Sequence, residues 1–121
     1  MANNQTFGRQ GEDLAAGFLT EEGYTILERN WHFRHNEVDI IALKNDQLVI
    51  VEVKTRSGNS YGEPSTAVDF RKQRYLIFAA ERYLFSHKID LEVRFDIISI
   101  IIDQGRTVLE HIPEAFHPIA R

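Results

Sequence analysis

Acidic residues interrupt two apolar, strand-like runs in the first half of the chain. The runs are EVDIIAL, residues 37–43, and QLVIVEVKT, residues 47–55, and the residues between them, Asn45 and Asp46 among them, have turn chemistry. Burying an unpaired charge is costly. Carboxylates inside such runs are therefore expected to have a partner or a chemical task.

The turn between the runs predicts which side chains face each other. A hairpin centred on the Asn-Asp pair places Asp39 opposite Glu52, and it places Glu37 opposite Lys54. Because side chains alternate along a strand, these four polar groups are expected to project from one face. The other face is expected to hold four apolar residues: Val38, Ile40, Val51 and Val53.

Two adjacent carboxylates with a nearby ammonium group could do metal-assisted chemistry. Adjacent carboxylates repel each other, and a hard divalent cation such as Mg²⁺, which prefers oxygen ligands and keeps several waters, relieves that repulsion. Lys54 could then orient a water molecule or stabilise charge on a phosphate, which is the minimum equipment for hydrolysing a phosphodiester. The alternative is an ion-pair network, with Glu37 bound to Lys54, and Asp39 bound to Arg56 or Arg34.

A third acid lies in the first amphipathic segment. Helical periodicity predicts a helix over residues 8–22, with Gly23 as its C-terminal cap, and Glu12 lies close enough to the apolar stripe to point at the sheet. The alternative for Glu12 is a solvated acid favoured by the helix dipole.

The remaining elements predict one domain that holds these side chains. Strands are expected over residues 24–31, 37–43, 47–55, 91–102 and 107–112, and a second helix from Ser65 or Thr66 to Ser86, with Val68 in its apolar stripe. A chain of 121 residues is the size of one domain with a single core, here residues 1–121. The order α-β-β-β-α-β-β predicts an α/β fold with a mixed sheet flanked by helices.

Composition and charge restrict the function further. The chain has no cysteine, which leaves oxygen and imidazole as metal ligands and fits a reducing cytoplasm. No secretory leader is expected, because the first residues lack a basic region followed by an apolar stretch. No bilayer-spanning run is expected either, because the longest apolar run, near residues 97–102, is too short. The net charge is −4, but residues 29–74 hold eight Lys or Arg against six Asp or Glu, so this segment is the candidate for a polyanion-binding surface. Within it, Arg56 and Lys72 are the candidate phosphate contacts.

Seven short motifs in order resemble the YraN-type family of small bacterial proteins. The motifs are GRQGEDLAAGFL, ERNW, NEVDIIAL, VIVEVKTR, YGEP, AVDFRKQRY and RFDII, which together extend from Gly8 to Ile98. The resemblance implies a restriction-endonuclease-like fold, related to that of archaeal Holliday junction resolvases. It implies that Asp39 and Glu52 are metal-binding acids, that Lys54 is the catalytic lysine, that Glu12 completes the site and that the Val53 carbonyl is a further metal ligand.

The function expected from these residues and this resemblance is a cytoplasmic endonuclease-like protein. It would use Mg²⁺ or Mn²⁺ to hydrolyse DNA, with branched or recombination intermediates as candidate substrates. Resolvases of this fold class act as dimers, so the resemblance also implies a homodimer. The alternative is a non-catalytic nucleic-acid-binding or adaptor module that keeps the nuclease fold. A module of that kind would bind DNA in a salt-sensitive way and release no product.

Overall fold

Two helices and five strands make up the computed structural model, which describes residues 4–58 and 68–118. In chain order they are α1 (Asn4–Glu21), β1 (Thr25–Phe33), β2 (Asn36–Lys44), β3 (Gln47–Ser57), α2 (Phe70–His87), β4 (Glu92–Asp103) and β5 (Arg106–Phe116). The strands form one sheet in the order β1-β2-β3-β4-β5. Only β3 and β4 are parallel, as the long connection through α2 requires. This order of elements is the predicted one.

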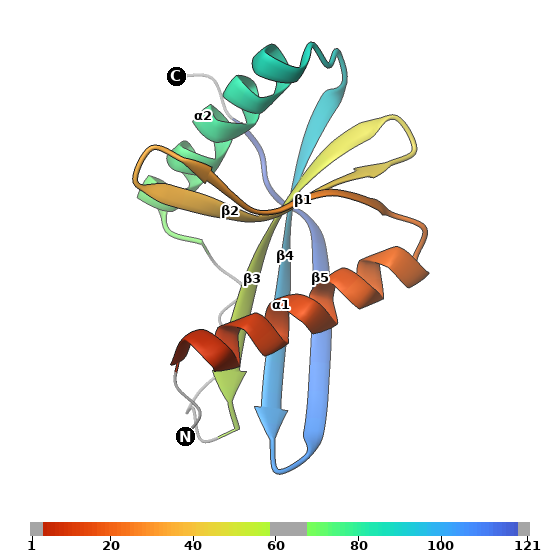
Figure 1. Ribbon diagram of the computed structural model, residues 1–121, viewed down its shortest axis with the longest axis vertical. Helices are drawn as coiled ribbons and strands as arrows, with labels where there is room; N and C mark the ends of the chain where they lie inside the picture. The colour runs from red at the N-terminus through yellow and green to blue at the C-terminus, as the bar shows by residue number, and fades with distance from the viewer. Residues whose placement is uncertain (1–3, 59–67, 119–121) are drawn as a thin grey trace.

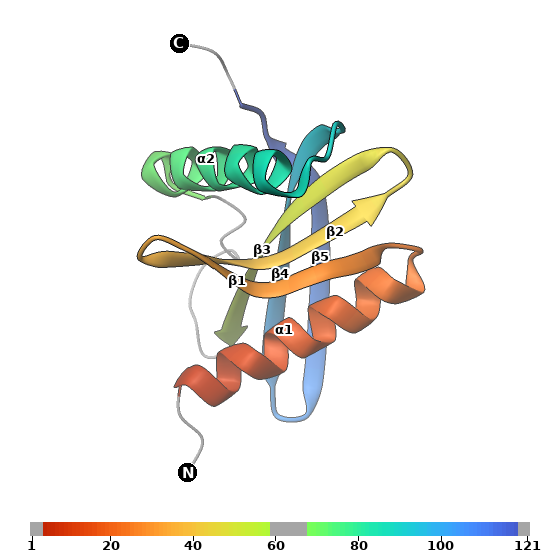
Figure 2. The same cartoon turned by 45° about the horizontal axis from the view of Figure 1, so that its top comes forward.

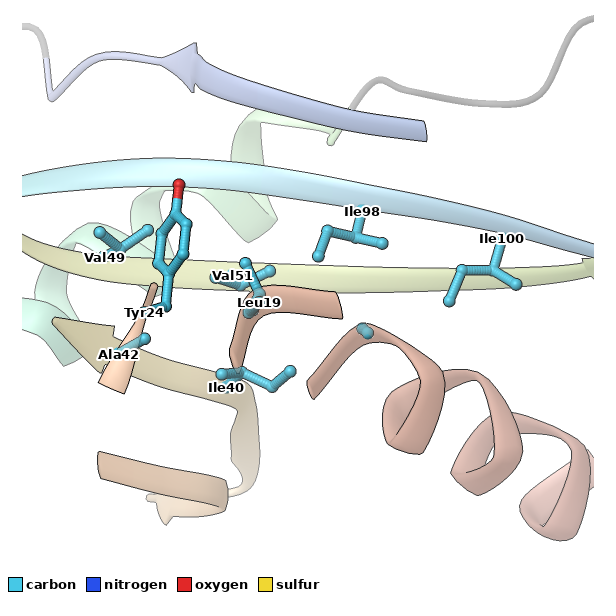
Figure 3. Close-up of a cluster of buried hydrophobic side chains, with 9 residues drawn as sticks. Leu19, Tyr24, Ile40, Ala42, Val49, Val51, Ile98 and Ile100 are labelled. Atoms are coloured by element: carbon cyan, nitrogen blue, oxygen red, sulfur yellow. The ribbon is translucent and has the colours of Figure 1, made fainter. Parts of the chain in front are cut away.

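The two helices cover opposite faces of the sheet (Figures 1 and 2). Beneath α1, Ala15 and Leu19 pack on a cluster from β2, β3 and β4 that includes Ile40, Val51 and Ile98 (Figure 3). Beneath α2, Leu76, Ala79, Ala80 and Tyr83 pack on a second cluster that includes Ile41, Ile50 and Phe95. The expected α/β mixed sheet flanked by helices is therefore confirmed. Over the described ranges, no helix is long and apolar enough to cross a bilayer.

The predicted register of the central hairpin is correct as far as Ile40, which pairs with Val51. Beyond that pair the two strands separate, and the first part of β2 stays paired with β1 alone. Figure 1 shows this β1–β2 arm turning towards α2 while β3 continues alongside β4. Two tyrosines of α2 hold the arm: the Tyr75 hydroxyl donates to the Phe33 carbonyl at 2.9 Å, and the Tyr83 hydroxyl donates to Glu28 at 3.2 Å.

This separation overturns two details of the expected hairpin. Val38 packs in the α2 cluster, whereas Ile40, Val51 and Val53 pack against α1, so Val38 does not share their face. The expected Glu37–Lys54 pairing is also wrong, because the ladder between β2 and β3 ends before it. Both errors have one cause, since strict alternation and a continued register hold only while the two strands stay paired.

Helix α2 begins later than expected. Ser65 and Thr66 lie outside the described residues, and Val68 precedes the helix instead of joining its stripe. Asp69 is the N-cap, with an extended backbone and a carboxylate that accepts the Lys72 N–H at 2.8 Å. Aspartate caps the backbone N–H groups of a helix N-terminus as well as serine or threonine does. Because this short stretch holds three candidate caps, the sequence alone does not determine where the helix begins.

Helix α1 approaches β3 closely at Gly11. A methyl group placed on Gly11 would lie 2.9 Å from both Cβ and Cγ2 of Thr55, closer than real Cβ contacts come. Gly17, later in the same helix, has open space at that position. Gly11 therefore sets the distance between α1 and the sheet, next to Glu12.

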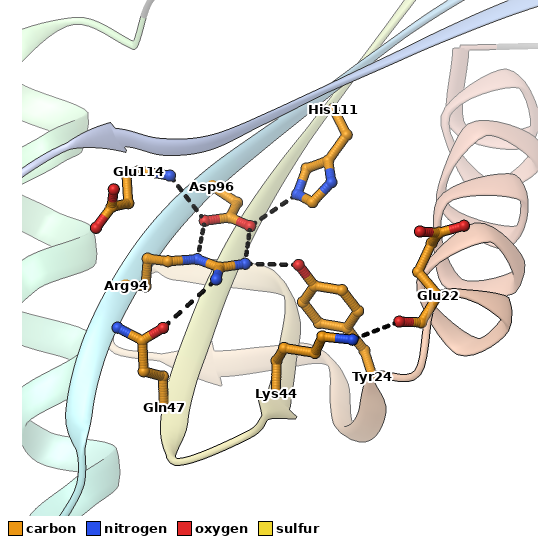
Figure 4. Close-up of polar contacts among 8 residues, drawn as sticks. All are labelled: Glu22, Tyr24, Lys44, Gln47, Arg94, Asp96, His111 and Glu114. Atoms are coloured by element: carbon orange, nitrogen blue, oxygen red, sulfur yellow. Dashed lines mark hydrogen bonds and ion pairs between the residues drawn. The ribbon is translucent and has the colours of Figure 1, made fainter.

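A buried ionic network ties β4 to its neighbours on the face of the sheet that α1 covers (Figure 4). Asp96 is 1% exposed and accepts hydrogen bonds from Arg94 at 2.8 Å and from the Glu114 N–H at 3.1 Å, and its Oδ2 lies 2.7 Å from His111 Nε2. Arg94 also donates to the Tyr24 hydroxyl at 2.6 Å. Burial alone would raise the pKa of Asp96, but the hydrogen bonds from His111 and Arg94 outweigh it and the pKa is lowered. Arg94 and Asp96, two residues apart on β4, therefore form a structural ion pair.

Candidate metal and nucleic-acid site

The point where β2 leaves β3 is also where the predicted acids meet. Asp39 lies one residue before the last β2–β3 pair, and Glu52 lies one residue after it on the other strand. One carboxylate oxygen of Asp39 accepts the Val53 backbone N–H at 2.8 Å. The Asp39 side chain thus takes an N–H that a neighbouring strand would otherwise bind. This hydrogen bond holds the carboxylate against β3 where the strands separate.

Burial and mutual repulsion change the ionisation of this pair. Desolvation, followed by repulsion from Glu52 and a smaller repulsion from Glu12, raises the pKa of Asp39 to about 8, although the Val53 N–H opposes the rise. Desolvation also raises the pKa of Glu52, against the attraction of Lys72 and Lys54. Without a cation between them, the two carboxylates therefore retain a proton at neutral pH.

Two lysines bring positive charge to Glu52 from different elements. Lys72 reaches it from the first turn of α2, with its Nζ 3.7 Å from a Glu52 oxygen. Lys54 lies two residues further along β3 and also favours the ionised form of Glu52. The sequence suggested Lys72 only as a phosphate contact, and its position beside Glu52 adds a role in compensating charge.

Glu12 approaches from α1 and is held by a residue that the sequence reasoning missed. The Asn30 side-chain amide donates to Glu12 at 3.0 Å and to Glu37 at 3.5 Å, so one NH₂ group bridges two carboxylates. Glu37 also lies 3.2 Å from His32 Nε2. Asn30 has a φ of 53°, a left-handed conformation that asparagine tolerates better than most residues. The sequence held one signal for this role of Asn30: it is a polar residue between Leu27 and Trp31, which both pack on the α2 cluster.

The donor atoms suit a hard divalent cation. Glu52 Oε1 is buried and has no hydrogen-bond partner, which leaves one carboxylate oxygen without the contact that such groups normally have. Across residues 4–58 and 68–118, no three acidic or histidine side chains gather closely enough to hold a metal by themselves. The two carboxylates therefore suit an ion such as Mg²⁺ or Mn²⁺, which binds through one or two carboxylates and completes its coordination shell with water and phosphate oxygens. Coordination by the Val53 carbonyl and by Glu12 stays a prediction.

The candidate phosphate contacts lie on either side of the acids. Arg56 is half-buried on β3, two residues beyond Lys54, and Lys72 is on the first turn of α2. A phosphodiester placed over Glu52 would therefore have cationic side chains from two separate elements within reach. Phosphate binding by Arg56 and Lys72 stays a prediction.

Comparison with known proteins identifies the family of this chain. A family model described as "Uncharacterised protein family UPF0102" matches residues 11–100, a range that contains every candidate site residue from Glu12 to Lys72. The chain belongs to the UPF0102 family.

Relatives in this family match nearly the whole length of the chain. A UPF0102 protein of Parabacteroides distasonis is 44% identical and covers 100% of both chains. One from Bacteroides thetaiotaomicron is 46% identical over 98% of both chains. One from Rhodococcus opacus is 48% identical over 96% of this chain and 100% of its own.

Proposed function

We propose that this UPF0102 protein is a metal-dependent nuclease that hydrolyses DNA phosphodiesters. The observation that carries the proposal is the buried pair Asp39 and Glu52, in which the pKa of Asp39 is raised to about 8 and one Glu52 oxygen has no hydrogen-bond partner. A pair of this kind is unfavourable in the metal-free protein, and a divalent cation in place of the retained proton would stabilise it. The resemblance to restriction-endonuclease-like nucleases and resolvases supports the same roles.

Each side chain has a part in the proposed reaction. Asp39 and Glu52 would hold Mg²⁺ or Mn²⁺, and the cation, when bound, would polarise the phosphate and compensate its charge. Lys54 orients the attacking water and stabilises the charge that develops on the phosphate. Glu12, held by Asn30, adds negative charge behind Asp39, and Arg56 and Lys72 position the DNA backbone.

Cleavage assays on labelled linear, flapped and four-way-junction DNA test this function. With Mg²⁺ or Mn²⁺, we expect the wild type to cut at least one of these substrates, and Lys54→Ala and Asp39→Asn to lose cleavage. Arg82→Ala, which removes an exposed charge on α2 ten residues beyond Lys72, is the matched control and should cut normally. Equal cleavage by the wild type and Lys54→Ala would overturn the assignment.

Binding measurements distinguish the nuclease from a non-catalytic module. In EDTA, Arg56→Ala and Lys72→Ala should each weaken DNA binding. Each should also reduce the slope of the logarithm of the binding constant against the logarithm of salt concentration by about one, the value for one lost phosphate contact. Salt-sensitive binding by a wild type that cuts no substrate with either metal would favour the binding module instead.

A further inference from the structure

A single serine interrupts an apolar run of β4. Residues 97–102 are isoleucine at every position except Ser99. The Ser99 side chain is 2% exposed, and its hydroxyl has no hydrogen-bond partner among the described residues. Burying a hydroxyl without a partner is unfavourable, so a serine at this position calls for a physical explanation.

The pairing of β3 with β4 places this hydroxyl beside Lys54. The two strands are parallel and stay in register over residues 47–57 of β3, with Lys54 paired to Ser99. Paired residues of neighbouring strands project from the same face, and the faces alternate along the pair. The preceding pair, Val53 and Ile98, packs beneath α1, so the next pair projects from the α2 side of the sheet. Neighbouring strands lie about 4.8 Å apart, a distance that a lysine side chain spans easily.

Ser99 shares its unpaired state with Glu52. Within residues 4–58 and 68–118, the Ser99 hydroxyl and Glu52 Oε1 are the only buried side-chain polar atoms without a hydrogen-bond partner. Both are neighbours of Lys54, since Glu52 is two residues earlier on β3 and Ser99 is the paired residue on β4. Unpaired buried polar atoms are rare in folded proteins. Two of them beside the proposed catalytic lysine indicate contacts that form only when the site is occupied.

A serine hydroxyl suits the ammonium group of a lysine. An ammonium has three N–H donors and no acceptor, whereas a hydroxyl has two acceptor lone pairs. If one N–H of Lys54 binds the hydroxyl, two remain for the attacking water and the phosphate. A lysine has a flexible four-carbon stem, so a fixed acceptor on the next strand restricts the directions of its ammonium group. Isoleucine, the residue at every other position of this run, offers no acceptor.

We propose that Ser99 is a positioning residue for Lys54, and that its hydroxyl accepts a hydrogen bond from the Lys54 ammonium group when DNA and a divalent cation are bound. This inference rests on the proposed function, because it assigns Ser99 a role in the same site. Hydrogen bonds of catalytic groups are often long in the ligand-free protein and tighten in the complex, which accounts for the unpaired hydroxyl. Ser99 acts through Lys54 and contacts neither the DNA nor the cation.

DNA binding in Ca²⁺ tests the contact separately from cleavage. Ca²⁺ takes the same oxygen ligands as Mg²⁺, with a looser geometry. For a labelled four-way junction, Ser99→Ala should raise the dissociation constant by about threefold to tenfold, because the lysine loses its fixed acceptor. In a Lys54→Ala background the same substitution should have no further effect, since the hydroxyl acts only through the lysine. Additive losses from the two substitutions would overturn the proposal.

Cleavage and stability should respond differently to the loss of the hydroxyl. With Mg²⁺ and saturating DNA, Ser99→Ala should lower the single-turnover rate by about tenfold or more, and Ser99→Thr, which keeps the hydroxyl, should retain most of it. In EDTA, the urea midpoint of Ser99→Ala should stay the same or rise, because this variant no longer buries an unpaired hydroxyl. Ser86→Ala, an exposed position at the far end of α2, is the matched control and should leave binding and cleavage unchanged.

The outcomes separate this role from the nuclease function itself. A Ser99→Ala protein that binds and cuts like the wild type would refute the role. A lower urea midpoint would also refute it, because the hydroxyl would then have a structural partner. If the wild type binds DNA but cuts no substrate, the nuclease function fails, while the coupling between Ser99 and Lys54 in Ca²⁺ still decides whether the two side chains meet.

Discussion

Replacing Asp39 by asparagine should stabilise the metal-free protein. The pKa of Asp39 rises from an ordinary 3.8 to about 8 in the folded chain. Between these values the folded chain holds a proton that the unfolded chain releases, so the stability of the wild type falls as the pH rises from about 4 to about 8. At pH 7 the carboxyl group costs up to about 4 kcal/mol, at roughly 1.4 kcal/mol per unit of pKa shift. Asparagine removes this cost and can still accept the Val53 N–H.

Urea unfolding in EDTA at several pH values measures this effect. We expect Asp39→Asn to raise the free energy of unfolding by roughly 2–4 kcal/mol at pH 7, and by little at pH 4. Asp46→Asn, an exposed aspartate in the β2–β3 turn, is the matched control and should keep the slope of the wild type against pH. Adding Mn²⁺ should stabilise the wild type but not Asp39→Asn, because the cation needs the ionised pair. An Asp39→Asn protein whose stability has the same pH dependence as the wild type would refute the reasoning.

Substitutions at four other positions test the packing and should be measured by urea unfolding. Gly11→Ala should destabilise the protein by about 1–3 kcal/mol, because the new methyl group meets Thr55. Gly17→Ala should stabilise the protein by about 0.5–1 kcal/mol, because alanine has the higher helix propensity and this position has open space. Stabilisation by both substitutions would show that α1 lies further from the sheet. Arg94→Ala should cost about 3–5 kcal/mol, since it leaves the buried Asp96 carboxylate poorly compensated, and a loss below 1 kcal/mol would contradict that account. Asp69→Ala should cost about 1 kcal/mol and Asp69→Asn almost nothing, and equal losses would rule out the capping hydrogen bond.

The sequence predicted those parts of the fold that depend on local periodicity. Amphipathic spacing placed both helices, and the turn at Asn45 and Asp46 gave the correct hairpin register, because a short turn allows few alignments. The same register correctly brought Asp39 and Glu52 to one place. These features need only the residues next to them in the chain.

The remaining features depend on contacts between distant segments. The separation of β2 from β3 comes from the β1–β2 arm packing on α2, through hydrogen bonds such as that from Tyr75 to Phe33, 42 residues apart. Lys72 beside Glu52 and Asn30 between two carboxylates need three-dimensional placement of elements that periodicity alone does not supply. The shift of the α2 start to Phe70 had a different cause, since several capping residues compete in one stretch.

The separation of β2 from β3 divides the sheet into an arm and a body that meet at the acids. The arm, formed by β1 and the first part of β2, is held by α2, while the second part of β3 belongs to the body with β4 and α1. Beyond the Ile40–Val51 pair, the hydrogen bond from the Val53 N–H to Asp39 crosses the gap between them. Any ligand that binds Asp39 and Glu52 together adds a second crosslink there. Ligand binding should therefore be visible as slower amide hydrogen exchange along residues 36–39 and 52–55, even without a change in the mean structure.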